Sequence, residues 1–176
     1  ITNATTATLS GTAEAGATVK VYDGSTRIAT VTANSSGEWT FVAAGLANGS
    51  HSFKAKQIDV AGNESGYSSA STMTVDTVAP SAPSLVATFV DSGVSHTDHI
   101  TNATSALLSG VAAKGVPVQV FDGTTQIATV TANATTGAWS YNATGLADGA
   151  HSFTARQMDI AGNLSAPSAA SSMTVD

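Results

Sequence analysis

The sequence predicts an all-β protein, built as two β-sandwich domains in tandem. Short strand-like segments recur at regular intervals and are separated by Gly, Asn, Asp and Ser residues, which favour turns. The segment that starts at Ile1 recurs from Ile100 with most of its residues unchanged. A repeat of about 100 residues is long enough to be a whole small domain. No window has the periodicity of a long amphipathic helix.

In the first copy, apolar and polar residues alternate along short segments, so each segment has one apolar face. This pattern is typical of half-buried antiparallel strands. The segments cover residues 7–13, 19–21, 26–33, 39–41, 53–56 and 73–75. Trp39 and Phe41 share one face of their strand, and we therefore expect Trp39 and its counterpart Trp139 to pack in the core.

The turn before residue 26 carries its own signal. An Asp23-Gly24 pair ahead of Thr26 predicts a tight hairpin turn, and Asp122-Gly123 is its counterpart in the second copy. Residues 28–31 break the strict alternation, which predicts a β-bulge or a strand that changes sheets.

A proline-containing segment, residues 77–84, separates the copies and predicts a semi-rigid linker between domains 1–76 and 85–176. Residues 85–90 follow it as the expected opening strand of the second domain, and a long polar loop leads to the repeated segment. Nothing before Ile1 matches this strand in the first copy. We therefore expect the first copy to be an N-terminally truncated repeat that lacks its opening strand and exposes a sheet edge unless preceding sequence covers it.

Composition excludes several functions. Charged residues make up 10% of the chain and the formal net charge is -6, which argues against a nucleic-acid-binding surface. No apolar stretch is long enough to span a membrane. Cysteine is absent, so disulfides do not hold the domains. No nucleophile elbow, zinc-protease, P-loop or dinucleotide motif is present, and the sequence does not predict an enzyme.

The acidic residues lie almost entirely at predicted turns and strand ends. Alternate loops of an antiparallel sandwich gather at one pole, so we expect Glu14 to lie near the loop 59–63. In the second domain the same pole holds the loop 159–163, which we expect to face Asp76. Carboxylate and amide oxygens are the ligands that calcium prefers. The predicted calcium ligands are Glu14, Asp59, Asn63, Asp76, Asp159 and Asn163.

An alternative is that these Asp and Asn residues only shape turns through side-chain hydrogen bonds to the backbone. Asp91 and Asp98, in the long loop of the second domain, could form a second calcium position or be solvated carboxylates. His96 and His99 flank Asp98, but zinc needs three or four ligands and no partner motif is present. We expect both histidines to lie on the surface.

The motifs GTAEAGATV, DVAGN and VDTVAP resemble the bacterial immunoglobulin-like repeats of large type I secreted adhesins and biofilm-associated proteins. The resemblance covers essentially the whole chain. It implies tandem immunoglobulin-like β-sandwiches, secretion to the bacterial cell surface, and calcium ions that stiffen the junctions between repeats. The second copy departs from the pattern, because AEAG becomes Ala112-Ala113-Lys114-Gly115, which loses the glutamate and gains a lysine.

The resemblance and the repeat together predict extender repeats in the stalk of a cell-surface adhesin, which serve cell adhesion and biofilm formation. The expected partners are neighbouring repeats of the same chain, and a host or surface ligand would be bound by a distal domain. Two alternatives remain. One is an immunoglobulin-like module that itself binds a ligand or glycan, and the other is an accessory repeat of a secreted polysaccharide-degrading enzyme.

Overall fold

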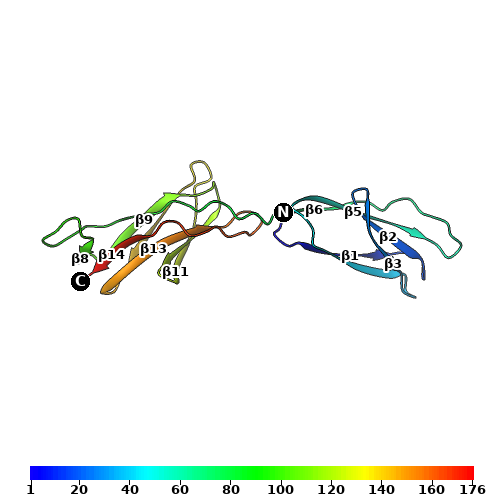
Figure 1. Cartoon of the computed structure of the whole chain (residues 1–176), viewed down its shortest axis with the longest axis horizontal. Coiled ribbons are helices and arrows are strands. Elements are labelled where there is room, and N and C mark those ends of the chain that lie inside the picture. Colours follow the sequence, from blue (N-terminus) through cyan, green and yellow to red (C-terminus); the bar gives the residue numbers. More distant parts are fainter. The chain divides into compact units, whose positions relative to one another are not determined.

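The computed structural model describes residues 1–176 and divides into two compact units. The first unit is Ile1–Thr77 and the second is Val78–Asp176, and the predicted linker, residues 77–84, overlaps their boundary. Every regular element in both units is a β-strand (Figure 1), so the all-β prediction is confirmed. No segment forms a helix that is long and apolar enough to cross a lipid bilayer.

The first unit consists of two antiparallel sheets. One sheet pairs β1 with β4, and the other has the strand order β3-β2-β5-β6. The strands are β1 (Thr6–Thr12), β2 (Thr18–Asp23), β3 (Thr26–Thr32), β4 (Glu38–Ala44), β5 (Gly49–Ile58) and β6 (Ser71–Val75). The predicted alternation is visible in the burial of β2, where Val19 and Val21 are buried and Lys20 is not.

The second unit repeats this plan with more strands. A three-stranded sheet has the order β12-β9-β7, and a five-stranded sheet has the order β11-β10-β13-β14-β8. The strands are β7 (Val86–Thr88), β8 (Ile100–Thr101), β9 (Ser105–Val111), β10 (Pro117–Asp122), β11 (Thr125–Thr131), β12 (Ala138–Thr144), β13 (Gly149–Gln157) and β14 (Ser171–Val175). Leu108, Val118, Val120 and Phe153 have no exposed surface, and they form the centre of its core.

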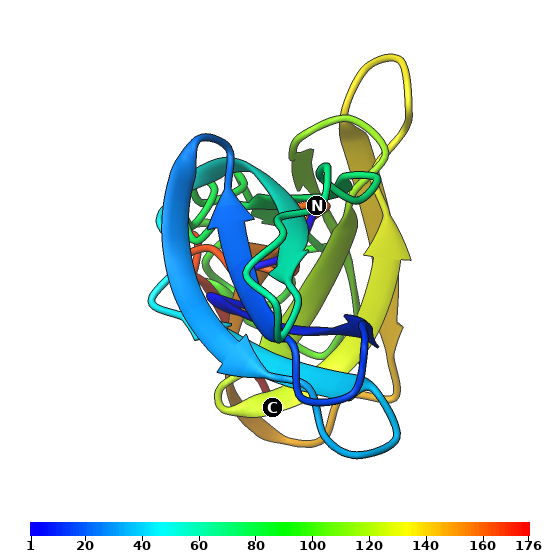
Figure 2. The same cartoon turned by 90° about the vertical axis from the view of Figure 1, so that its right-hand side faces the viewer.

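The hairpin of β2 and β3 forms where the sequence predicts it, and Figure 2 shows this curved hairpin (blue) at the front of the first unit. Gly24 has a φ of 58°, which a side chain would strain. Val21 pairs with Ala29, but the next residue, Tyr22, pairs with Arg27. Ile28 is therefore the extra residue of a β-bulge, and the bulge predicted within residues 28–31 is confirmed.

The two units differ at one sheet edge. In the second unit β7 pairs with β9, with Val86 opposite Ser109. In the first unit β1, the counterpart of β9, pairs only with β4. The remaining framework is shared, because Thr2 forms a parallel bridge to Val75 just as Thr101 pairs with Val175.

Candidate functional site

The carboxylate of Asp59 organises the loop that follows β5. Its Oδ1 accepts a hydrogen bond from the backbone N–H of Asn63 at 2.7 Å, and its Oδ2 accepts one from the Asn63 side-chain amide at 2.7 Å. The hydrogen bond from the Asn63 side chain, together with those from backbone N–H groups, lowers the pKa of Asp59 below its ordinary value.

Asp159 performs the same role in the loop that follows β13. Its Oδ1 accepts hydrogen bonds from the backbone N–H groups of Ala161 (2.9 Å) and Asn163 (2.8 Å), and its Oδ2 accepts one from the Asn163 amide (2.9 Å). The Asn163 side chain is the main cause of a lowered pKa at Asp159. Both loops therefore have the side-chain-to-backbone bonds that shape Asx turns.

Two other predicted calcium ligands lie at opposite ends of the first unit. Glu14 is exposed, and its backbone N–H donates to the Gln57 Oε1 at 2.8 Å, which places it at the same end as Asp59. Asp76 follows β6 at the other end, where Val75 pairs with Gly49.

The long loop of the second unit contains the remaining candidates. Asp91 Oδ2 accepts a hydrogen bond from the backbone N–H of His99 at 3.2 Å, whereas Asp91 Oδ1 is buried without a hydrogen-bond partner. Asp98 Oδ1 accepts one from the Ile100 N–H at 3.1 Å. His96 and His99 are both exposed, and His96 Nδ1 lies 2.9 Å from the Asp91 carbonyl oxygen.

The oxygen donors of these loops are of the kind that calcium binds, but each loop supplies few of them. Calcium takes six to eight oxygen ligands. Within each unit, no three His, Asp or Glu side chains come together as a group that could hold a metal ion. The loops 59–63 and 159–163, each with one carboxylate, therefore do not fit a calcium ion by themselves.

Pairing between Asp23 and His51 is the feature that the sequence did not predict. The Nδ1 of His51, at the start of β5, lies 2.5 Å from Asp23 Oδ2, and Asp23 Oδ1 accepts a hydrogen bond from the Ser52 N–H at 2.9 Å. His51 Nε2 lies 2.8 Å from the Ala47 carbonyl oxygen, and the ring stacks on Phe53. An imidazolium, which has two N–H donors, satisfies both acceptors.

The pairing changes the pKa of both residues. The hydrogen bond with Asp23, followed by that to the Ala47 carbonyl, raises the pKa of His51. Burial alone would raise the pKa of Asp23, but the hydrogen bonds with His51 and Ser52 outweigh burial and lower that pKa.

The second unit has the same arrangement. His151 Nδ1 lies 2.6 Å from Asp122 Oδ2, and His151 Nε2 lies 2.9 Å from the Ala147 carbonyl oxygen. The Ala147 carbonyl, followed by Asp122, raises the pKa of His151. The signal in the sequence is that both an Asp-Gly turn and a His-Ser-Phe segment recur in the two copies.

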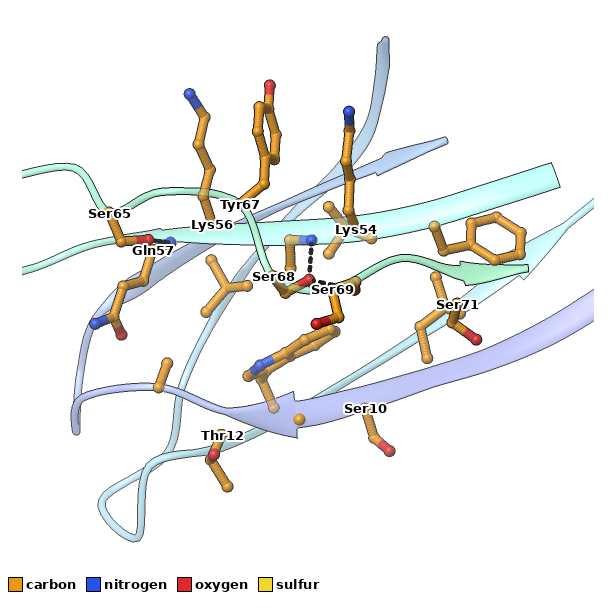
Figure 3. A pocket seen from close by; sticks show the side chains of 18 of the residues that line it. Ser10, Thr12, Lys54, Lys56, Gln57, Ser65, Tyr67, Ser68, Ser69 and Ser71 are labelled. Atoms are coloured by element: carbon orange, nitrogen blue, oxygen red, sulfur yellow. Dashed lines mark hydrogen bonds between the residues drawn. The ribbon is translucent and has the colours of Figure 1, made fainter. Parts of the chain in front are cut away.

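A groove of about 820 Å³ opens along the first unit between β1 and the segment 65–71. We call it the open groove. Trp39 and Phe53 form part of its floor, and Gly11 gives it a side-chain-free stretch of β1. Figure 3 shows the side chains of Lys54, Lys56 and Tyr67 extending away from β1, so the groove itself is lined largely by small polar and apolar groups.

A small cationic and aromatic cluster lies on the outer side of this groove. The Nζ of Lys54 lies 4.3 Å from the centre of the Tyr67 ring, and Tyr67 packs edge-on against Tyr22. Lys56 and Lys20 both form ion pairs of 2.9 Å with Glu64. Ion pairs this exposed contribute little stability.

Comparisons with known proteins identify relatives of two kinds. Exoglucanase A of Cellulomonas fimi is 42% identical over 68% of this chain, and exoglucanase B of the same species is 34% identical over 99%. The chain spans only 13% and 16% of these two enzymes. Among solved structures, a calcium-stabilised adhesin with which an Antarctic bacterium reaches out and binds ice has a TM-score of 0.57. That similarity has 28% identity and covers 99% of this chain and 45% of the adhesin.

The family model of the bacterial Ig-like domain matches residues 1–77 and again residues 79–176. The two matches coincide closely with the two units of the structure. The chain therefore belongs to the bacterial Ig-like domain family and carries two copies of the domain.

Proposed function

We propose that the two domains are spacer repeats in the stalk of an extracellular bacterial protein. The observation that supports this proposal is the path of the chain through the second unit. Ser81, near its start, accepts a hydrogen bond from Gln157 at the end of β13. Asp176 follows Val175, which pairs with Gly149 at the beginning of β13.

The second unit thus begins and ends at opposite ends of a nine-residue strand. Such a strand is about 30 Å long, so each domain of this kind would lengthen the protein by at least that distance. A spacer that matches the gap to a distant target raises the effective concentration of a domain at its tip. The rings of His51 and His151 form hydrogen bonds within their own domains. The proposed role therefore depends on the folded domain as a spacer and not on these side chains.

Calcium is part of the proposal. The ligands that we propose are Asp76, Asp159 and Asn163 at one junction, and Glu14, Asp59 and Asn63 at the corresponding end of the first domain. The support is the chemistry of these oxygen donors and the likeness to a calcium-stabilised adhesin. A bound ion would hold neighbouring domains in one orientation and so stiffen the stalk.

The partners in this proposal are neighbouring repeats of the same chain, with adhesion to a host or surface ligand left to a distal domain. The location is the bacterial cell surface or the secreted fraction. A second candidate, an accessory repeat of a secreted polysaccharide-degrading enzyme, is favoured by the identity with the two exoglucanases. A spacer serves either protein, and the two candidates differ in what the spacer carries.

Distance measurements between the two domains test the spacer role. The chain has no cysteine, so Ala15→Cys and Asp148→Cys create unique labelling sites at exposed loop positions. We expect single-molecule energy transfer to report one extended population with labels at least about 60 Å apart, twice the length of a nine-residue strand. A compact or broadly distributed population would contradict a spacer, and saturable binding to an insoluble polysaccharide would favour a ligand-binding module.

Calcium is tested with the same labelled chain. We expect added calcium to narrow the distance distribution and raise Tm, and EDTA to reverse both effects. Asp159→Asn removes the charge and keeps one oxygen for the backbone hydrogen bonds of the turn, so it should abolish the calcium effect. Because its amide nitrogen cannot accept the hydrogen bond from the Asn163 side chain, the calcium-free Tm should fall slightly. Glu38→Gln, which makes the same kind of change at an exposed carboxylate outside the proposed ligand set, is the control. Identical profiles with calcium and with EDTA would remove calcium from the proposal without affecting the spacer role.

A further inference from the structure

We propose that the outer face of the β3-β2-β5 sheet in the first domain binds an acidic polysaccharide, a polymer whose sugars carry carboxylates. We call this surface the basic face, and it consists of Lys20, Tyr22, Arg27, Lys54, Lys56, Glu64 and Tyr67. Contact with such a polymer requires the extracellular location of the proposed function. It does not require the spacer role, because the whole surface lies within one domain.

The strand register gathers the basic residues on this face. Lys54 of β5 lies opposite Tyr22 of β2, and Lys56 lies opposite Lys20. On the other side of β2, Arg27 of β3 lies opposite Tyr22. Residues that face each other across antiparallel strands have their side chains on the same side of the sheet. The valines that alternate with Lys20 are buried, so the four basic residues point away from the core.

This arrangement concentrates positive charge on a domain that is acidic as a whole. Residues 1–77 contain six acidic and four basic residues, and all four basic ones belong to the basic face. Glu64 is its single carboxylate, and it forms ion pairs of 2.9 Å with Lys20 and Lys56. Lys54 and Arg27 have no carboxylate partner. With four cations and one carboxylate, the basic face carries a formal charge of +3, which complements an anionic ligand.

Tyr67 holds two of the lysines in place. The Nζ atoms of Lys54 and Lys56 lie 4.3 Å and 5.0 Å from the centre of the Tyr67 ring. Figure 3 shows the ring between these two side chains, with its hydroxyl and both ammonium groups at their outer ends. These cation–π contacts restrict side chains that would otherwise be flexible, so less conformational entropy is lost when a ligand binds. The result is a row of three hydrogen-bond donors for carboxylates and hydroxyls.

The chemistry of the basic face favours a polysaccharide over a nucleic acid. Glu64 lies among the lysines, where its oxygens can accept hydrogen bonds from sugar hydroxyls. The same carboxylate would repel a phosphate backbone, which in duplex DNA carries one charge per about 1.7 Å. Tyr67 is 50% exposed, so it can contact a sugar ring as well as donate from its hydroxyl. A polymer with at most one carboxylate per sugar matches this sparse arrangement of cations.

The second domain has the same three strands without this charge. Its residues at the corresponding positions are mostly uncharged: Gln119, Phe121, Gln126, Thr154, Arg156, Leu164 and Pro167. They keep the same register, since Phe121 pairs with both Gln126 and Thr154. The segment that precedes the repeat pairs with β9 in the other sheet, away from these positions. The fold therefore does not need the basic residues, and the second domain provides an internal control.

Titration of the full chain with oligogalacturonate, in EDTA and at low ionic strength, tests the proposal. We expect saturable binding that shifts the NMR signals of the Lys54 and Tyr67 backbone amides and leaves that of Thr154 unchanged. The methyl ester of the same oligosaccharide should bind about tenfold more weakly, because esterification removes the negative charges. Single-stranded DNA with the same number of charges should also bind about tenfold more weakly, because Glu64 repels its phosphates.

Variants that carry the second domain's residues locate the site. Lys54→Thr and Arg27→Gln should each weaken binding about fourfold, the scale of one exposed ion pair. Together with Lys20→Gln they should abolish detectable binding, while Tm stays close to that of the unchanged chain. Lys114→Gln removes the same charge from an exposed loop of the second domain and should leave the affinity unchanged.

Three results would overturn the proposal: unchanged affinity in the triple variant, equal binding of the methyl ester, or tighter binding of DNA, which would make the basic face a nucleic-acid surface. A dimer that forms without polysaccharide and is lost in the triple variant would also overturn it, because a second copy would then be the occupant. None of these results bears on the interdomain distance, which tests the spacer role separately.

Discussion

His51 and Asp23 are 28 residues apart in sequence, yet the His51 Nδ1 and the Asp23 Oδ2 lie 2.5 Å apart where β5 starts beside the end of β2. The second His51 nitrogen faces a backbone carbonyl, so the ring joins the β2–β3 turn to the loop before β5. The same pair recurs as His151 and Asp122. In each domain the histidine thus connects two loops, and the strength of this connection depends on whether the histidine is protonated.

Asp23→Asn is expected to flatten the pH dependence of the stability of the first domain. Because the pKa of His51 is raised above 6.5, its protonation stabilises the fold fully below pH 6.5, and this contribution is lost as pH rises through the raised pKa. Asp23, with a lowered pKa, contributes above pH 3.8 and loses its contribution as pH falls through the lowered value. Urea unfolding between pH 5 and pH 9 measures the effect.

At pH 5.5 we expect Asp23→Asn to lower the free energy of unfolding by about 1.5 kcal/mol, the value of a hydrogen bond to a charged group. At pH 9 the loss should be much smaller. Asp148→Asn, which makes the same chemical change on an exposed loop, should have no effect at either pH. An unchanged pH slope in Asp23→Asn would show that the pair does not stabilise the folded state.

Asp59→Ala is expected to lower Tm more than Asp59→Asn, because asparagine keeps an oxygen that can accept the Asn63 backbone hydrogen bond. The pKa of Asp59 is lowered, so the carboxylate's contribution is present above pH 3.8 and is lost as pH falls through the lowered value. Thermal unfolding at pH 7 and pH 3, without calcium, measures both effects. Equal Tm values for the two variants would contradict a turn-shaping role.

The sequence predicted the elements that depend on neighbouring residues. The Asp23-Gly24 turn and the bulge at Ile28 are local, because glycine at positive φ and a broken alternation leave a visible pattern. The pairing of His51 with Asp23 is not local. It depends on the register of β2 against β5, where Asp23 lies opposite Phe53, and no sequence pattern in a single copy fixes that register.

The burial of the two tryptophans also depends on residues that are distant in the sequence. Alternation correctly predicted that Trp39 and Trp139 face inward, but only Trp139 is fully covered. The cover comes from Leu85, Ala87 and Phe89, which belong to a different part of the chain. Burial therefore depends on a strand partner that the local pattern cannot reveal. The proposed calcium ligands remain predictions for a similar reason, since they require groups from separate loops to converge.

Trp139→Ala is expected to destabilise its domain by about 4 kcal/mol, since it removes a buried tryptophan and leaves a cavity. Trp39→Ala should cost about half as much, because Trp39 already borders the open groove and water can fill the space. Urea unfolding followed by far-ultraviolet circular dichroism measures each loss. In each variant the remaining tryptophan reports the other domain, whose midpoint should not move. Equal costs would contradict the difference in burial.

Gly110→Ala is expected to destabilise the second domain by about 3 kcal/mol, the upper range for an overpacked site, because the new methyl group overlaps the Ser84 carbonyl. The strand Val86–Thr88 should then detach, and its amide protons should exchange faster with solvent.

Gly11→Ala is the matched change in the first domain, where the methyl group meets only the edge of the Trp39 ring. It should cost less than about 1 kcal/mol, since the indole can shift slightly. Hydrogen exchange and urea unfolding of both variants measure the difference. If the two substitutions were equally costly, the contact between Gly110 and Ser84 would not be what holds the opening strand in place.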